Sequence, residues 1–272
     1  MATRLKIATK WNELNYWQLS IIGRILYSDK ALNKPVFYNV LVFILLLGKP
    51  SIGNFFRMLK VFRRFTFKDF SSLADFIFDE SDSLNNFPKS FKVKVGKFKT
   101  IELYGPANRL ANICVEELSY ADTFYYNWIT NGKDDDLRRL TACLYRPAGT
   151  GSSSTDPRCS FDKLLLPNNA ELTDKIPMHL QYIVALAFQG TRRSFQKRYP
   201  WIYPAPTPKH EEVEEKPQPK KPKPYHPFSK IAQSMAMDDV QVFGTLQQTN
   251  QSNAIEFLEV YNELLHRQYK KK

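Results

Sequence analysis

A run rich in proline, lysine and glutamate between residues 204 and 227 divides the chain. Proline fixes its own φ, removes a backbone donor and holds the preceding residue in an extended conformation, so this run cannot bury a core. Such a composition is typical of a solvated, semi-rigid spacer with polyproline character. The sequence therefore predicts a body over residues 1–203, a Pro/Lys/Glu-rich linker over residues 204–227 and a small helical tail module over residues 228–272.

The body and the tail module differ in what they can bury. The 203 residues before the linker are enough for one sizeable core. The 45 residues after the linker are marginal in isolation, because a segment this short buries too little apolar surface. We therefore expect the tail module to pack against the body or against a partner.

The formal net charge of +12 lies almost entirely in the body, and the tail module is neutral. Electrostatic attraction to nucleic acid or to an acidic protein therefore belongs to the body. A sequence pI near 9.5 permits nucleic-acid binding but does not specify it.

The cysteines and the apolar runs indicate in which cellular compartment the protein is expected. Cys114, Cys143 and Cys159 form no CxxC pair, and their odd number predicts reduced thiols rather than a disulfide framework. The first residues lack the apolar core of a secretory signal, and the run 36–47 is about a dozen residues long, where a membrane span needs about twenty. We expect a cytoplasmic protein with no membrane partner.

Helical patterns dominate the first part of the chain. Asn15 and Gln18 match a capping box for a helix that runs to about Tyr27. A buried helix follows Pro35, which suits a first helical position. The next helix carries a stripe of Phe55, Leu59 and Phe62, expected to face inward, with arginines and lysine around it.

A period of two replaces the helical period at Phe91. It predicts a β-hairpin near residues 91–103 with a turn at Gly96, set into a body that is otherwise mainly α. Pro106 then suits the start of a helix that runs past residue 125, and Asp134 the start of another that ends before Pro147.

The end of the body and the tail module complete the pattern. Residues 148–160 are small and polar and predict a mobile loop. The last body helix is expected over residues 177–188, with Gly190 as its stop and a basic turn after it. The tail predicts a short helix at 228–237 and a longer one capped by Ser252, whose inward face is the candidate partner-binding stripe Phe257, Tyr261, Leu264 and Leu265.

The residue patterns that suggest catalysis or metal binding each have a simpler structural explanation. The aspartates at 134–136 suit a helix start better than a metal site, because adjacent helical residues do not face one point. The run from Gly149 lacks the Lys and Ser/Thr ending of a phosphate loop, and the histidines have no zinc spacing. No GxSxG elbow is present. We predict no enzyme activity, no cofactor and no metal site.

Two basic clusters mix arginine or lysine with aromatic residues, which can neutralise phosphates and stack on bases. The aromatic spacing also fits a core face with solvated cations around it, so a protein-binding face and a nucleic-acid site both remain open. This candidate basic patch consists of Arg57, Lys60, Arg63, Arg64, Arg192, Arg193, Lys197 and Arg198.

Four segments carry a resemblance over nearly the whole chain: WNELNYWQL from residue 11, LYGPANRLANICVEELSYADTFYY from 103, LRRLTACLYRP from 137, and AFQGTRRSFQKRYPWIYP from 187. They resemble a family of phage and prophage tail-module proteins of Gram-negative anaerobes. The resemblance implies a helical, non-enzymatic morphogenesis factor in the host cytoplasm. By analogy of genome position, it implies a tail assembly chaperone or adaptor for the tape-measure protein or a neighbouring tail component. The alternative is a nucleic-acid-binding protein that uses the basic body.

Overall fold

The computed structural model describes residues 7–28, 34–70, 72–79, 81–153, 156–203, 228, 232–233 and 242–270. The predicted linker, residues 204–227, and most of the predicted helix at 228–237 lie outside these residues.

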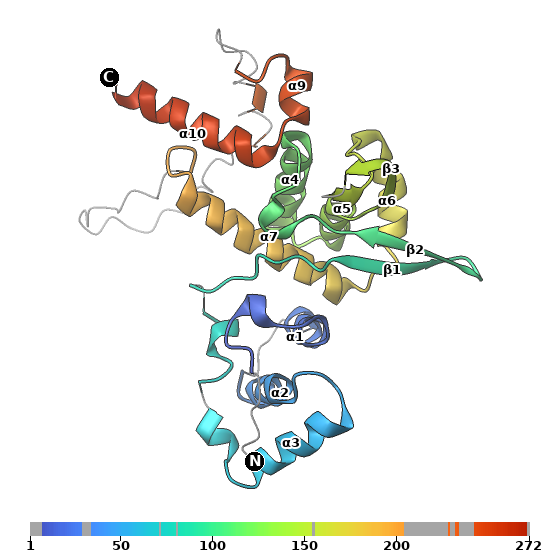
Figure 1. Ribbon diagram of the computed structural model, residues 1–272, viewed down its shortest axis with the longest axis vertical. Helices are drawn as coiled ribbons and strands as arrows, with labels where there is room; N and C mark the ends of the chain where they lie inside the picture. The colour runs from blue at the N-terminus through green and yellow to red at the C-terminus, as the bar shows by residue number, and fades with distance from the viewer. Residues whose placement is uncertain are drawn as a thin grey trace.

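The described residues form a mainly helical fold with a small antiparallel sheet, which confirms the predicted fold class (Figure 1). The helices are α1 (Tyr16–Ser28), α2 (Lys34–Leu47), α3 (Ile52–Phe62), α4 (Val115–Asn131), α5 (Asp134–Leu144), α6 (Leu166–Thr173), α7 (Met178–Arg198), α9 (Leu246–Gln251) and α10 (Ala254–Lys270). The strands are β1 (Ser90–Val95), β2 (Lys99–Tyr104), β3 (Arg146–Ser153) and β4 (Asp156–Arg158).

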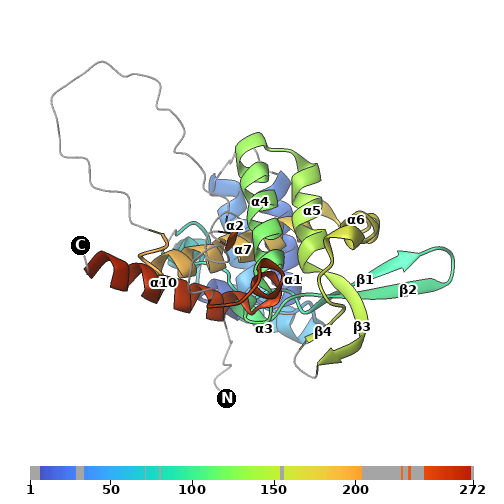
Figure 2. The same cartoon turned by 90° about the horizontal axis from the view of Figure 1, so that it is seen from above.

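Helix α7 lies at the centre, where α1 packs on one side of it and α5 on another (Figures 1 and 2). The crossing with α1 is close because Gly23 has no side chain: a Cβ there would lie 2.6 Å from Cγ1 of Ile183. Ile22 and Ile183 are fully buried beside this crossing. Helices α2 and α3 extend away from α7 on the far side of α1 (Figure 1).

Several predicted elements are confirmed where their signals are local. The backbone N–H of Asn15 donates to Oε1 of Gln18 at 3.1 Å, and the N–H of Gln18 donates back to Oδ1 of Asn15 at 3.1 Å, so the capping box opens α1. The hairpin forms with Gly96 at a φ of 79° in its turn. The stripe of α5 is fully buried at Leu137, Leu140 and Leu144.

The prediction of a mobile loop over residues 148–160 is wrong. This segment forms β3 and β4, and the sheet has the strand order β1-β2-β3-β4. The cause is a buried ion network. Glu117 on α4 accepts from Arg158 at 2.7 Å and from Arg146 at 3.0 Å, and Arg158 also binds Asp156 at 2.9 Å. Two arginines and two carboxylates balance in charge, so the hairpin is held onto α4 without an unpaired buried ion.

The predicted end of the last body helix at Gly190 is also wrong, because α7 continues through the expected basic turn to Arg198. Gly190 has a packing role instead. A Cβ at this position would lie 2.0 Å from the carbonyl oxygen of Leu84, so the segment at residues 83–84 crosses directly over the helix backbone.

Two predicted helix starts change as well. Helix α4 begins at Val115, not near Pro106, and its N-cap is Cys114, whose Sγ accepts from the N–H of Glu117 at 3.5 Å. Residues 108–110 form a short 3-10 turn in which Arg109 has a φ of 57°. The N–H groups that open α10 donate to Oδ1 of Asn253, so Asn253 takes the capping role predicted for Ser252.

The C-terminal helices pack on α4. The N–H of Ala254 donates to the carbonyl of Ile113 at 2.9 Å, and the N–H of Val115 donates to the carbonyl of Ser252 at 3.0 Å. The side chain of Asn253 adds a bond to the carbonyl of Ala111 at 2.9 Å. Backbone and side-chain bonds therefore join the start of α10 to the start of α4.

Candidate partner-binding surface

Helix α3 forms at the end of the molecule, below α2 in Figure 1. Ser51 caps it, because its side chain accepts from the N–H of Asn54 at 3.2 Å. Met58 is 1% exposed and points inward, and Phe62 is half-buried against Phe67 with ring centroids 4.6 Å apart. One face of α3 is thus anchored to the protein.

The neighbouring face of α3 is apolar and exposed. Its four residues follow the helical spacing i, i+3, i+4, i+7, so they form one stripe. Phe56 is 58% exposed and Ile52 79%. The outer stripe consists of Ile52, Phe55, Phe56 and Leu59, and the exposed Phe65 and Phe67 follow it in sequence.

This exposure corrects the predicted inward stripe of Phe55, Leu59 and Phe62. Phe55 and Leu59 face outward, Phe62 is half-buried, and Met58 is the residue that reaches the core. Apolar residues occupy a wide part of the circumference of α3. Helix α2 and the turn after α3 cover only part of it. Sequence periodicity alone shows an apolar face but not which of two faces has a neighbour.

The first half of the basic patch flanks the outer stripe. Arg57, Lys60, Arg63 and Arg64 are all exposed. At 100° per residue Arg57 and Lys60 lie together on one side of the stripe, and Arg63 and Arg64 follow at the end of α3. The surface therefore joins an apolar band to a cationic border. A shallow depression of about 500 Å³ lies at its start, lined by Leu47, Pro50, Ser51, Ile52, Phe55 and Phe56.

The second half of the basic patch does not join it. Arg192 donates to Asp122 of α4 at 2.7 Å, and Arg198 pairs with Glu259 of α10 and lies over the ring of Tyr199. Arg193 lines a small cavity, while Lys197 is exposed. Arg192 and Arg198 therefore join α7 to neighbouring helices, and the predicted patch is not one continuous surface.

The predicted partner-binding stripe of the tail has a different environment from the one expected. Phe257 is 0% exposed, and its ring packs near those of Phe228, Phe243 and Tyr261 at 5.4–6.0 Å between centroids. Tyr261, Leu264 and Leu265 are half-buried. The chain itself covers Phe257, so this residue is not available to a partner in this structure.

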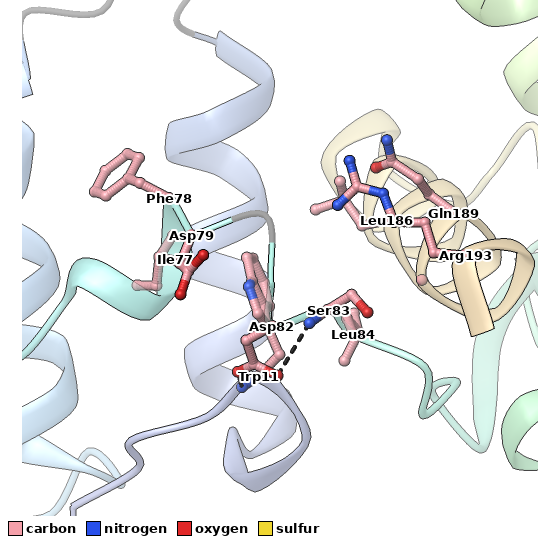
Figure 3. A pocket seen from close by; sticks show the side chains of 11 residues that line it. Trp11, Ile77, Phe78, Asp79, Asp82, Ser83, Leu84, Leu186, Gln189 and Arg193 are labelled. Carbon is pink, nitrogen blue, oxygen red and sulfur yellow. Dashed lines mark hydrogen bonds between the residues drawn. The ribbon is translucent and has the colours of Figure 1, made fainter. Parts of the chain in front are cut away.

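A cavity of about 120 Å³, which the sequence did not indicate, lies between α7 and residues 77–84 (Figure 3). Asp82 accepts from the N–H groups of Trp11 and Ser83, each at 3.0 Å. Asp79 accepts from the hydroxyl of Ser81 at 2.6 Å and from its N–H at 2.8 Å, and these bonds lower the pKa of Asp79. Both carboxylates bind the chain's own loops, which favours a structural role.

The buried thiols behave as small apolar groups. Burial, followed by the charge of Glu117, raises the pKa of Cys114 to about 11, and burial raises the pKa of Cys143 well above its usual range. A thiol in this state is a poor nucleophile at neutral pH. Within the described residues, no three His, Cys, Asp or Glu side chains are grouped to hold a metal ion. None of the described helices combines the length and apolar character needed to cross a membrane.

No protein-family model matches the chain, and neither the curated proteins nor the solved structures contain a significant match. The chemistry of the α3 surface itself is therefore the guide to what it binds.

Proposed function

We propose that this chain is a non-enzymatic interaction protein that binds an amphipathic helix of a partner polypeptide on α3. In a phage, the partner would be a tail polypeptide such as the tape-measure protein, and the chain would act as its assembly chaperone or adaptor in the host cytoplasm. The observation that carries the proposal is the exposed stripe of Ile52, Phe55, Phe56 and Leu59.

The chemistry of this surface indicates the kind of partner. Exposed aromatic and aliphatic side chains at i, i+3, i+4 and i+7 match the apolar face of another helix. The flanking Arg57 and Lys60 favour a helix with acidic residues beside its apolar stripe. A tape-measure chain, long and helical with apolar stripes, needs such cover before assembly.

The test is co-expression of the chain with the tail polypeptides encoded beside it, followed by affinity purification. Phe55→Ser with Phe56→Ser should reduce the amount of co-purified polypeptide at least about tenfold, because removing two apolar side chains weakens binding by at least about 1.4 kcal/mol. The matched control is Ile129→Ser with Leu164→Ser, which removes two exposed apolar side chains elsewhere, of 51% and 78% exposure.

Circular dichroism should show that both double variants keep the fold. Equal co-purification by wild type and the α3 variant, or an equal reduction in both variants, would contradict the proposal.

A further inference from the structure

The β1–β2 hairpin projects beyond the neighbouring elements in both views (Figures 1 and 2). Its root is anchored, because Phe91, Val93 and Leu103 are almost completely buried. Its tip is exposed, and Phe98 in the turn is 93% exposed, the most of any large apolar residue described. The β1–β2 hairpin is thus held by its buried root, and its outer part is an exposed two-stranded ribbon.

The exposed part of this ribbon is strongly cationic. Five lysines occur in residues 89–104, against a single acidic residue, Glu102. All five are exposed: Lys89, Lys92, Lys94, Lys97 and Lys99. The ribbon therefore presents a concentration of positive charge that an α-helical core does not require, and it lies apart from the predicted basic patch.

The strand register distributes these cations over both faces. Lys92 pairs with Glu102 and Lys94 with Thr100, which places both lysines on one face. Lys99 pairs with Val95 and so belongs to the opposite face. Lys97 lies in the turn, with its ammonium 5.6 Å from the ring centre of Phe98. At its outer end the ribbon is cationic on both sides, with an aromatic ring at the tip.

We infer that the β1–β2 hairpin is an arm that binds duplex DNA through its phosphates. The major groove, about 12 Å wide, admits a two-stranded β-ribbon, and its two walls are lined with phosphates. Lysines on both faces of the ribbon can contact both walls of the groove at once. A flat anionic surface could contact only one face of the ribbon, so the groove is the better match. The exposed Phe98 would enter the groove first and meet the base edges.

The side chains also indicate the kind of recognition. The usual donors in bidentate base contacts are Arg, Lys, Asn and Gln. Of these four residue types, residues 90–104 contain only lysine. Lysine contacts to phosphate position a protein on DNA without reading its sequence. Binding should therefore be nearly independent of sequence and strongly dependent on salt.

The test is fluorescence anisotropy of the full chain with labelled 20-base-pair duplexes over a series of salt concentrations. The variant changes Lys92, Lys94, Lys97 and Lys99 to Gln. Its matched control changes Arg57, Lys60, Arg63 and Arg64 to Gln, which removes the same number of charges from another exposed surface. A single-stranded 20-mer and vesicles of anionic lipid serve as competing anionic ligands.

If the arm binds duplex DNA, the hairpin variant should bind at least about tenfold more weakly at low salt. The slope of log K against log salt should become shallower by up to about 3.6, or about 0.9 for each phosphate that a lysine no longer neutralises. The control variant should keep most of the affinity and slope. Equal weakening in the two variants, unchanged binding by the hairpin variant, or tighter binding to the single strand or to vesicles would overturn the inference.

Discussion

At the scale of single residues, the structure shows how charged and titratable groups are accommodated. Glu117 is 1% exposed, and its carboxylate is bound by both Arg146 and Arg158. His179 has a different environment, because it lies in the first turn of α7 with its Nε2 3.4 Å from Oγ of Ser20 on α1. Burial, and then the positive charge of Arg24, lower the pKa of His179.

This lowered pKa predicts a pH dependence of stability. Because the unfolded chain takes up the proton more readily than the folded chain, protonation favours unfolding. The unfolding free energy should therefore fall as pH decreases from about 6.5, the usual histidine pKa, through the lowered folded value. Denaturant titrations at several pH values would measure the fall, and His179→Gln should reduce it. An NMR titration that placed the pKa of His179 at or above 6.5 would contradict this prediction.

At the scale of elements, close crossings determine how the helices lie. Gly23 permits the approach of α1 to α7, and Gly190 permits residues 83–84 to cross α7. Gly53 in α3 has a different environment, because no atom lies within 4 Å of the position that its Cβ would occupy. The two helical positions 53 and 190 therefore differ in packing but share the same intrinsic preference for alanine over glycine.

The substitutions Gly190→Ala and Gly53→Ala should have opposite effects. At Gly190 the new methyl group would displace the backbone at Leu84, so we expect the unfolding free energy to fall by about 1–3 kcal/mol despite the better helix propensity. At Gly53 the same change should stabilise the chain by up to about 1 kcal/mol. Thermal and urea denaturation would measure both. Stabilisation by Gly190→Ala would show that the helix and residues 83–84 are not tightly packed at this crossing.

At the scale of the whole molecule, the C-terminal helices share the core of the body. Phe257 and Leu258 are each 0% exposed and belong to the same apolar cluster as the residues of α4 and α7. The contacts between Asn253, Ala254 and the start of α4 fix this arrangement. Rings of the tail module itself pack against Phe257, and the body adds cover at the start of α10, so this short segment does not depend on a partner to bury Phe257.

Phe257→Ala should therefore destabilise the whole chain rather than only abolish a partner contact. We expect the unfolding free energy to fall by about 3–5 kcal/mol, as for other buried phenylalanines. Leu265→Ala on the same helix should cost much less, because Leu265 is only half-buried. Differential scanning calorimetry of the purified variants would compare them. Equal melting temperatures for wild type and Phe257→Ala would indicate that α10 does not stabilise the body.

The sequence by itself determined the features that depend on neighbouring residues. The capping box at Asn15 and Gln18, the buried leucines of α5 and the turn at Gly96 all form as predicted, because each requires contacts across only a few positions. The candidate surface was predictable in part: the cations from Arg57 to Arg64 are exposed as expected.

Only the tertiary structure decided the rest. Strands β3 and β4 are held against α4 because Glu117 binds Arg158, 41 positions away. Gly190 lies inside α7 and lets Leu84 cross the helix, instead of ending it. The same principle separates Phe55 from Phe257. Both lie on apolar helical stripes, but Phe257 has rings of its own chain against it and Phe55 remains exposed. Periodicity specifies that a face is apolar, whereas the presence of a neighbour depends on segments distant in sequence that the fold brings together.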